Sequence, residues 1–64
     1  MIPRYSKKLI DLRGNKTREK VAKAVGISVS ALQMYENGER VPRDWIKIKL
    51  ADYYDVSVQY IFFS

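Results

Sequence analysis

The stretch "TREKVAKAVGISVSALQMYENGERVP", residues 17–42, decides the fold of this 64-residue chain. Apolar residues recur there at helical spacing on both sides of a short turn that begins at Gly26. Thr17 and Ser28 stand where the two helices would begin, because their side-chain oxygens can accept hydrogen bonds from free backbone N–H groups. The stretch therefore predicts two helices joined by a tight turn, a helix-turn-helix over residues 17–37.

Small and apolar side chains predict how these two helices pack. Ala22 leaves room for a close crossing, and Gly26 suits a backbone position of positive φ. Five apolar side chains would fill the angle between the helices: Val21, Val25, Ile27, Leu32 and Tyr35. The second helix would end at Asn37 and Gly38, and Pro42 would prevent its continuation. Short helical hairpins of unrelated domains can imitate this pattern, so function needs further observations.

The rest of the chain predicts three more helices. Apolar residues at helical spacing favour a first helix from about Ser6 to Arg13, with a left-handed stop at Gly14. A fourth helix is expected at about 43–54: the alternation in "WIKIKL" alone would suit a strand, but the continuing "ADYY" favours a helix. Ser57 would cap a last turn in "VQYIFF". With no strand partner, repeat or linker, residues 1–64 are expected to form one all-α domain of about five short helices.

Composition excludes several classes of function. Hydrophobic residues make up 47% of the chain, which is too many for a disordered protein, and cysteine and histidine are absent. Disulfides, cysteine nucleophiles and the commonest zinc sites are therefore ruled out. The few candidate acids and bases argue against an enzyme, and no cofactor is expected. No apolar run approaches the roughly 20 residues of a membrane span, so we expect a cytoplasmic protein.

Positive charge is concentrated in one part of the sequence. The net charge is +5, and residues 1–24 hold eight lysines or arginines against two acids. Residues 25–64 hold four basic residues against five acids. This asymmetry is compatible with a solvated surface, but it also favours attraction to a polyanion such as nucleic acid.

Residues 17–42 and the later stretch "KIKLADYYDVSVQYIF" resemble the Cro/CI-type (Xre-like) helix-turn-helix regulators of bacteria and phages. The resemblance implies a compact five-helix, lambda-repressor-like DNA-binding domain. It also implies a dimer on operator DNA that represses or activates transcription. Two positions depart from the family pattern: Arg18 stands where glutamine is frequent, and Asp55 stands where glycine is frequent. Arginine remains a suitable phosphate ligand, and aspartate tolerates the left-handed backbone conformation.

The outward face of the second helix of the motif supplies candidate base contacts. If Leu32 and Tyr35 point inward, the opposite arc holds Val29, Ser30, Gln33 and Met34. Ser30 could bond to base edges, Gln33 could pair with adenine, and the two apolar side chains could contact thymine methyl groups. The resemblance implies base contacts at the same positions. The alternative is that all four are ordinary exposed side chains.

Phosphate contacts are expected at both ends of the motif. The candidates are Thr17, Arg18, Asn37, Arg40 and Arg43. Thr17 and Arg18 would use the positive N-terminal end of a helix, and the resemblance implies backbone contacts for the loop after the second helix. Alternatively, Thr17 only caps its helix and Arg40 pairs with Glu36 or Glu39. The lysines of residues 1–24 would add long-range attraction, or would only solvate the surface.

The C-terminal tail supplies a candidate dimer contact. Ile61, Phe62 and Phe63 form an unusually apolar end for a small chain. Two copies joined there could place their recognition helices one DNA turn, roughly 34 Å, apart on a palindromic operator. The alternative is that the tail folds back onto its own core.

Together these observations predict a sequence-specific regulator that binds double-stranded DNA. We expect a homodimeric repressor, associated with the nucleoid, that has no small-molecule ligand and no membrane contact. A protein-interaction module, such as an antitoxin built on the same fold, remains a competing hypothesis. A non-specific nucleoid or RNA binder is another.

Overall fold

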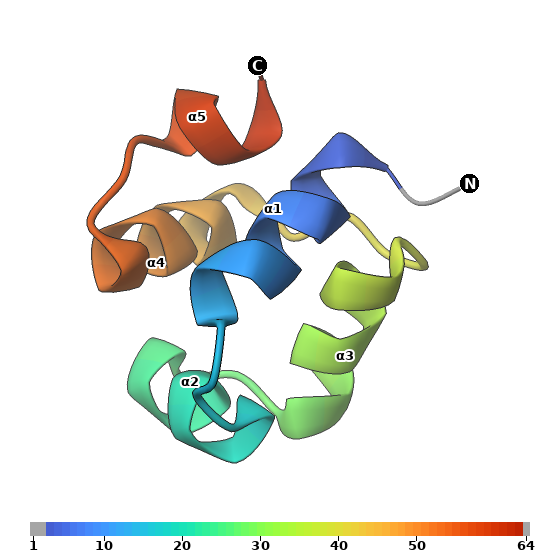
Figure 1. Cartoon of the computed structure of the whole chain (residues 1–64), viewed down its shortest axis with the longest axis vertical. Coiled ribbons are helices and arrows are strands. Elements are labelled where there is room, and N and C mark those ends of the chain that lie inside the picture. Colours follow the sequence, from blue (N-terminus) through green and yellow to red (C-terminus); the bar gives the residue numbers. More distant parts are fainter. Residues whose placement is uncertain (1–2, 64) are drawn as a thin grey trace.

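A computed structural model describes residues 3–63 and contains five helices within them (Figure 1). They are α1 (Arg4–Arg13), α2 (Arg18–Val25), α3 (Val29–Asn37), α4 (Asp44–Tyr54) and α5 (Val58–Phe62). This part of the chain has no strand, so the prediction of an all-α fold with five short helices is confirmed. None of these helices has the length and apolar character needed to cross a bilayer.

Three hydroxyl side chains begin helices, as the sequence predicts. The oxygen of Thr17 accepts a hydrogen bond from the backbone N–H of Lys20 at 3.1 Å. At the start of α3, the oxygen of Ser28 accepts a hydrogen bond from the backbone N–H of Ala31 at 3.0 Å. At the start of α5, the oxygen of Ser57 accepts one from the backbone N–H of Tyr60, also at 3.0 Å. Each bond satisfies one of the N–H groups that a helix start leaves free.

The other helix boundaries differ slightly from the predicted ones. α1 begins two residues before the expected Ser6, because Pro3 has a φ of −59° and its carbonyl accepts the N–H groups of Ser6 and Lys7. α4 begins at Asp44, one residue late. Gly14 has a φ of 54° but a ψ of −123°, so it ends α1 with a positive φ but outside the expected left-handed helical region.

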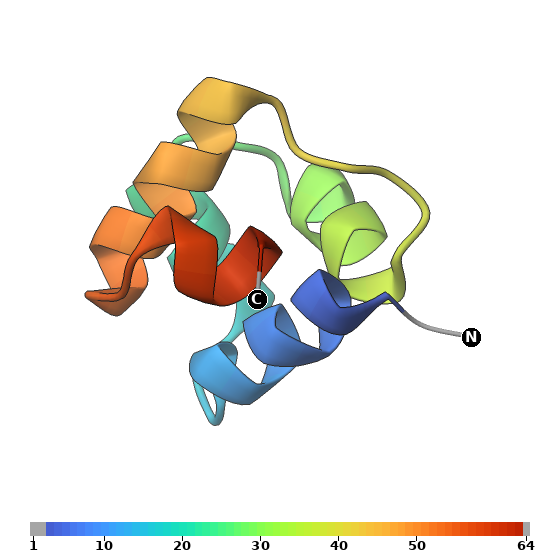
Figure 2. The same cartoon turned by 90° about the horizontal axis from the view of Figure 1, so that it is seen from above.

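The core lies where the five helices meet. Ten hydrophobic residues within 3–63 are buried, and they include Leu9 of α1, Val21 of α2, Leu32 of α3 and Leu50 of α4. α3 packs mainly against α1 and α2, whereas α5 packs on α1 and α4 (Figures 1 and 2). One side of α3 is therefore left without a neighbouring helix.

The C-terminal tail is divided between core and surface. Ile61, predicted as a dimer contact, packs in the core of its own chain. Because only 1% of Ile61 is exposed, it offers no area to a second copy in this fold. Phe62 is half-buried with its ring 5.7 Å from that of Tyr5, while Phe63 is 67% exposed. The alternative that the tail folds back therefore holds for Ile61, and only part of the tail remains at the surface.

Candidate functional site

The outward face of α3 carries the four residues that the sequence assigns to base reading. Ser30 and Gln33 are exposed, and Val29 and Met34 are each 37% exposed. The opposite face is buried through three residues: Leu32, Tyr35 and Glu36. The predicted orientation of α3 is thus confirmed, because neither apolar side chain of the outward face is packed beneath another described segment.

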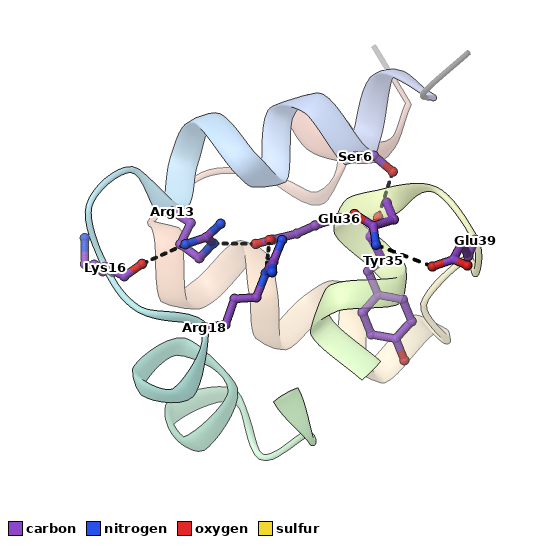
Figure 3. Close-up of polar contacts among 8 residues, drawn as sticks. Ser6, Arg13, Lys16, Arg18, Tyr35, Glu36 and Glu39 are labelled. Carbon is purple, nitrogen blue, oxygen red and sulfur yellow. Dashed lines mark hydrogen bonds and ion pairs between the residues drawn. The ribbon is translucent and has the colours of Figure 1, made fainter. Parts of the chain in front are cut away.

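A buried carboxylate fixes the inner side of α3. Glu36 is fully buried, and its two oxygens accept hydrogen bonds from Nε of Arg13 and Nε of Arg18, each at 2.8 Å (Figure 3). Arg13 ends α1 and Arg18 begins α2. One side chain of α3 therefore connects three helices through charge-assisted hydrogen bonds.

This cluster was not predicted from the sequence. The sequence suggests Glu36 only as a possible ion-pair partner for Arg40, whereas the structure pairs it with two other arginines. A signal was present, because Glu36 follows Leu32 by four residues and so lies on the buried face of α3. Its charge made the side chain look like a surface residue.

Arg18 has a structural role that the sequence did not predict. Its Nε is held by Glu36, and its side chain keeps 33% of its surface exposed. The rest of the guanidinium carries further N–H donors, since arginine has five. Arg18 therefore supports the packing of α2 against α3 besides being a candidate phosphate ligand.

The junction between α1 and α2 is strongly basic. An open depression of about 560 Å³ there has seven lining residues: Leu12, Arg13, Gly14, Asn15, Lys16, Thr17 and Lys20. Arg13 also donates from Nη1 to the carbonyl of Lys16 at 2.9 Å, which braces the loop. The lining has three cations and no acid, so it suits an anion. No three His, Cys, Asp or Glu side chains gather into a metal site among residues 3–63.

Two hydrogen bonds anchor the C-terminal end of α3 and the loop that follows it. The buried hydroxyl of Ser6 donates to the carbonyl of Tyr35 at 2.7 Å (Figure 3). The hydroxyl of Tyr5 donates to the carbonyl of Arg40 at 3.1 Å. Both donors belong to α1, so α1 fixes the position of α3 and of the loop.

The remaining candidate phosphate ligands lie at the end of α3 and on this anchored loop. Asn37, Arg40 and Arg43 are all exposed. The amide of Asn37 donates to the carboxylate of Glu39 at 3.4 Å, and no ion pair between Arg40 and either Glu36 or Glu39 forms. The five candidate phosphate ligands thus lie at the start of α2, at the end of α3 and just after it.

A tyrosine near the buried cluster has an altered acidity. Burial raises the pKa of Tyr54 to about 12, and the nearby Glu36 carboxylate contributes in the same direction, opposed in part by Arg13. The Tyr54 hydroxyl is buried and has no hydrogen-bond partner among residues 3–63. This group therefore belongs to the packing of the domain and not to its surface chemistry.

Comparison with known proteins identifies the family. A helix-turn-helix family model matches residues 7–61, which is most of the chain. Searches of curated proteins and of solved structures return no significant match. The matched region contains α2, the turn and α3, together with the core residues that hold them, in a five-helix lambda-repressor-like fold. The chain therefore belongs to the Cro/CI-type (Xre-like) helix-turn-helix family of DNA-binding regulators.

Proposed function

We propose that this protein is a sequence-specific regulator of transcription that reads double-stranded DNA with α3 in the major groove. The observation that carries the proposal is the division of α3 into two faces. Its inner face is held by the core and by Glu36, and its outer face presents four exposed side chains. The major groove is wide enough to admit an α-helix.

Each outward side chain has a partner of matching chemistry in the groove. Gln33 can accept from and donate to the adenine edge in a bidentate pair. Val29 and Met34 can contact thymine methyl groups, which gives these exposed apolar side chains a dry surface to pack against. Ser30 can donate to or accept from either kind of base pair.

Phosphate contacts at both ends of the motif would fix the register of α3. At the start of α2, Thr17 and Arg18 lie beside free backbone N–H groups and the positive end of the helix dipole. At the end of α3 and in the loop that follows it, the exposed side chains of Asn37, Arg40 and Arg43 can reach the strand on the other side of the groove. Such contacts position the protein without reading sequence.

The regulator would act as a homodimer on a palindromic operator. Two copies related by a two-fold axis present their recognition helices to successive major grooves, roughly 34 Å apart. Binding of this kind across a promoter excludes RNA polymerase, so we propose repression as the regulatory outcome.

Selection of bound fragments from random DNA tests this function directly. We expect a consensus of two inverted half-sites whose centres are one helical turn apart. Placing that consensus across a promoter should lower transcription of a reporter gene when the protein is present. Selection without any consensus would contradict sequence-specific binding and would favour a protein-interaction module or a non-specific binder.

The substitution Gln33→Ala then tests the role of α3. It should weaken operator binding by about 1–3 kcal/mol and relax the preference at one base pair in each half-site. The matched control is Gln59→Ala, which removes the same exposed side chain from α5 and should leave affinity unchanged. Equal affinities for both variants, measured by fluorescence anisotropy, would exclude a base contact by Gln33.

A further inference from the structure

The two arginines bound to Glu36 differ in how many of their nitrogens have partners (Figure 3). Arg13 donates from Nε to Glu36 and from Nη1 to the carbonyl of Lys16, and its side chain is 18% exposed. Arg18 donates only from Nε, and its side chain is 33% exposed. Neither Nη group of Arg18 has a hydrogen-bond partner among residues 3–63. The outer end of Arg18 is therefore available to a ligand.

The charges of this cluster favour an anion as that ligand. One carboxylate faces two guanidinium groups, so one positive charge is not balanced within the cluster. Arg18 is the more exposed of the two arginines, so solvent reaches the unbalanced charge there. Arg18 also begins α2, where the N–H groups of the first turn attract negative charge. A phosphate oxygen that accepts from the Nη groups of Arg18 would balance the cluster.

We infer that Glu36 is a positioning residue for DNA binding, because it holds the guanidinium of Arg18 with its Nη groups directed at a phosphate of the duplex; this rests on the proposed function. Glu36 is fully buried, so it acts on DNA only through Arg18. A mobile arginine loses rotamer freedom when it binds a phosphate, whereas an arginine already bound at Nε loses less. Glu36 therefore raises the affinity for DNA without contacting it.

The same hydrogen bond connects the phosphate contact to the base-reading face. Glu36 belongs to α3, as do Gln33 and Met34 on its outward side. The bond of 2.8 Å between Arg18 and Glu36 fixes the start of α2 relative to α3. A phosphate bound by Arg18 is thus held at a set distance from the outward face of α3. The depth at which α3 enters the major groove therefore depends on this bond.

A double-mutant cycle tests the inference. The probe is a short duplex of random sequence, because phosphate contacts carry no sequence information. Arg18→Gln should weaken binding about tenfold or more and lower the slope of log affinity against log salt by about 0.9. Glu36→Gln should weaken binding by a similar factor in the parent but hardly at all in the Arg18→Gln background. Equal losses in both backgrounds would mean that Glu36 acts only on the fold, which contradicts the inference.

The substitution Arg18→Lys covers the case in which Glu36→Gln does not fold. It keeps the positive charge but replaces the fork of donors by one ammonium group, which cannot serve the carboxylate and a phosphate with the same geometry. Binding to the random duplex should weaken about tenfold. Arg4→Lys is the control, because it makes the same exchange at an exposed position of α1 and should leave affinity unchanged. An Arg18→Lys variant that is folded by circular dichroism and binds like the parent would exclude the inference.

Nuclear magnetic resonance of the guanidinium groups gives a readout that a purely structural role would not change. In the free protein, the Nε–H groups of Arg13 and Arg18 should both exchange slowly with solvent, since both donate to Glu36. Addition of the random duplex should shift the Nη signals of Arg18 and slow the rotation of its guanidinium, with smaller changes at Arg13. Unchanged Nη signals of Arg18 in the complex would overturn the inference.

These measurements separate the inference from the function on which it rests. Binding to a selected operator without coupling between Arg18 and Glu36 would overturn the inference alone. Coupling on the random duplex, together with a selection that yields no consensus, would overturn sequence-specific regulation alone. A protein that binds no duplex at all would overturn both.

Discussion

Glu36 is the residue on which the alignment of the motif depends most directly. Transfer of a carboxylate from water into a protein interior costs several kcal/mol, and here two arginines compensate for that cost. The three groups carry a net charge of +1, so removal of the carboxylate would leave two arginines facing each other with nothing between them. Loss of this one side chain should therefore disturb α1, α2 and α3 together.

The substitution Glu36→Gln tests this role. It keeps the shape of the side chain but removes its charge, and we expect the free energy of unfolding to fall by about 3–5 kcal/mol, as for other broken buried ion pairs. Glu39→Gln is the control, because Glu39 is exposed and its loss of charge should cost less than about 0.5 kcal/mol. Urea denaturation measures both values. Similar losses in the two variants would mean that Glu36 adds no stability beyond that of a surface acid.

Tyr54 gives the stability of the domain a dependence on alkaline pH. The phenol has a pKa of 10.0 when unfolded and about 12 when folded, so folding favours its neutral form. This contribution is complete below pH 10 and is lost as the pH rises towards 12. Tyr54→Phe removes a buried hydroxyl without a partner, so the variant should be at least as stable as the parent at neutral pH. In urea denaturation, the difference in unfolding free energy between Tyr54→Phe and the parent should grow between pH 10 and 12. A constant difference across that range would contradict the raised pKa of Tyr54.

Helix ends at two glycines differ in how much space surrounds them. Gly26 and Gly38 both have a left-handed backbone, with φ of 87° and 77°. A Cβ at Gly26 would meet nothing within 4 Å, whereas a Cβ at Gly38 would collide with Cδ of Pro3. Of these two glycines, only Gly38 therefore packs closely against the start of α1.

Alanine substitutions should separate conformational strain from collision. Gly26→Ala should lower the free energy of unfolding by roughly 1–2 kcal/mol, which is the conformational strain of an alanine in the left-handed region. Gly38→Ala should cost more, because either α1 or the loop after α3 must also move. Thermal unfolding of the two variants gives the comparison. Equal losses of unfolding free energy in the two variants would show that the start of α1 can move aside without cost.

Most helix boundaries could be predicted from the sequence because they depend on neighbouring residues. Thr17, Ser28 and Ser57 act on the backbone three residues later, and Asp55 adopts the expected left-handed conformation with a φ of 58°. The outward face of α3 was equally predictable, since helical periodicity alone separates it from Leu32.

The features of the fold that could not be predicted depend on contacts between residues far apart in the sequence. The partners of Glu36 lie 18 and 23 residues away along the chain, so no local pattern shows that they meet. Ile61 looked like a surface residue because the sequence does not give the angle at which α5 folds against α1 and α4. Base contacts and the dimer surface also stay predictions, since they involve molecules other than this chain.

For the molecule as a whole, the uneven charge predicts a steep salt dependence of DNA binding. Each phosphate neutralised by a basic side chain contributes about 0.9 to the slope of log affinity against log salt. Arg43→Ala should therefore reduce the slope by about this amount and weaken binding to all sequences alike. Lys49→Ala is the control, because it removes one exposed charge from α4 and should leave the slope unchanged. Anisotropy titrations at several salt concentrations measure both slopes, and identical slopes would remove Arg43 from the set of phosphate ligands.

The two-faced construction of α3 also has an evolutionary consequence. The buried side chains of this helix lie on one side of it, at Leu32, Tyr35 and Glu36. We expect exchange of the exposed polar side chains on the other side, Ser30 and Gln33, to change stability little. A library randomised at those two positions should therefore yield many folded regulators with new target preferences, and the same freedom would let gene duplicates diverge quickly towards separate promoters.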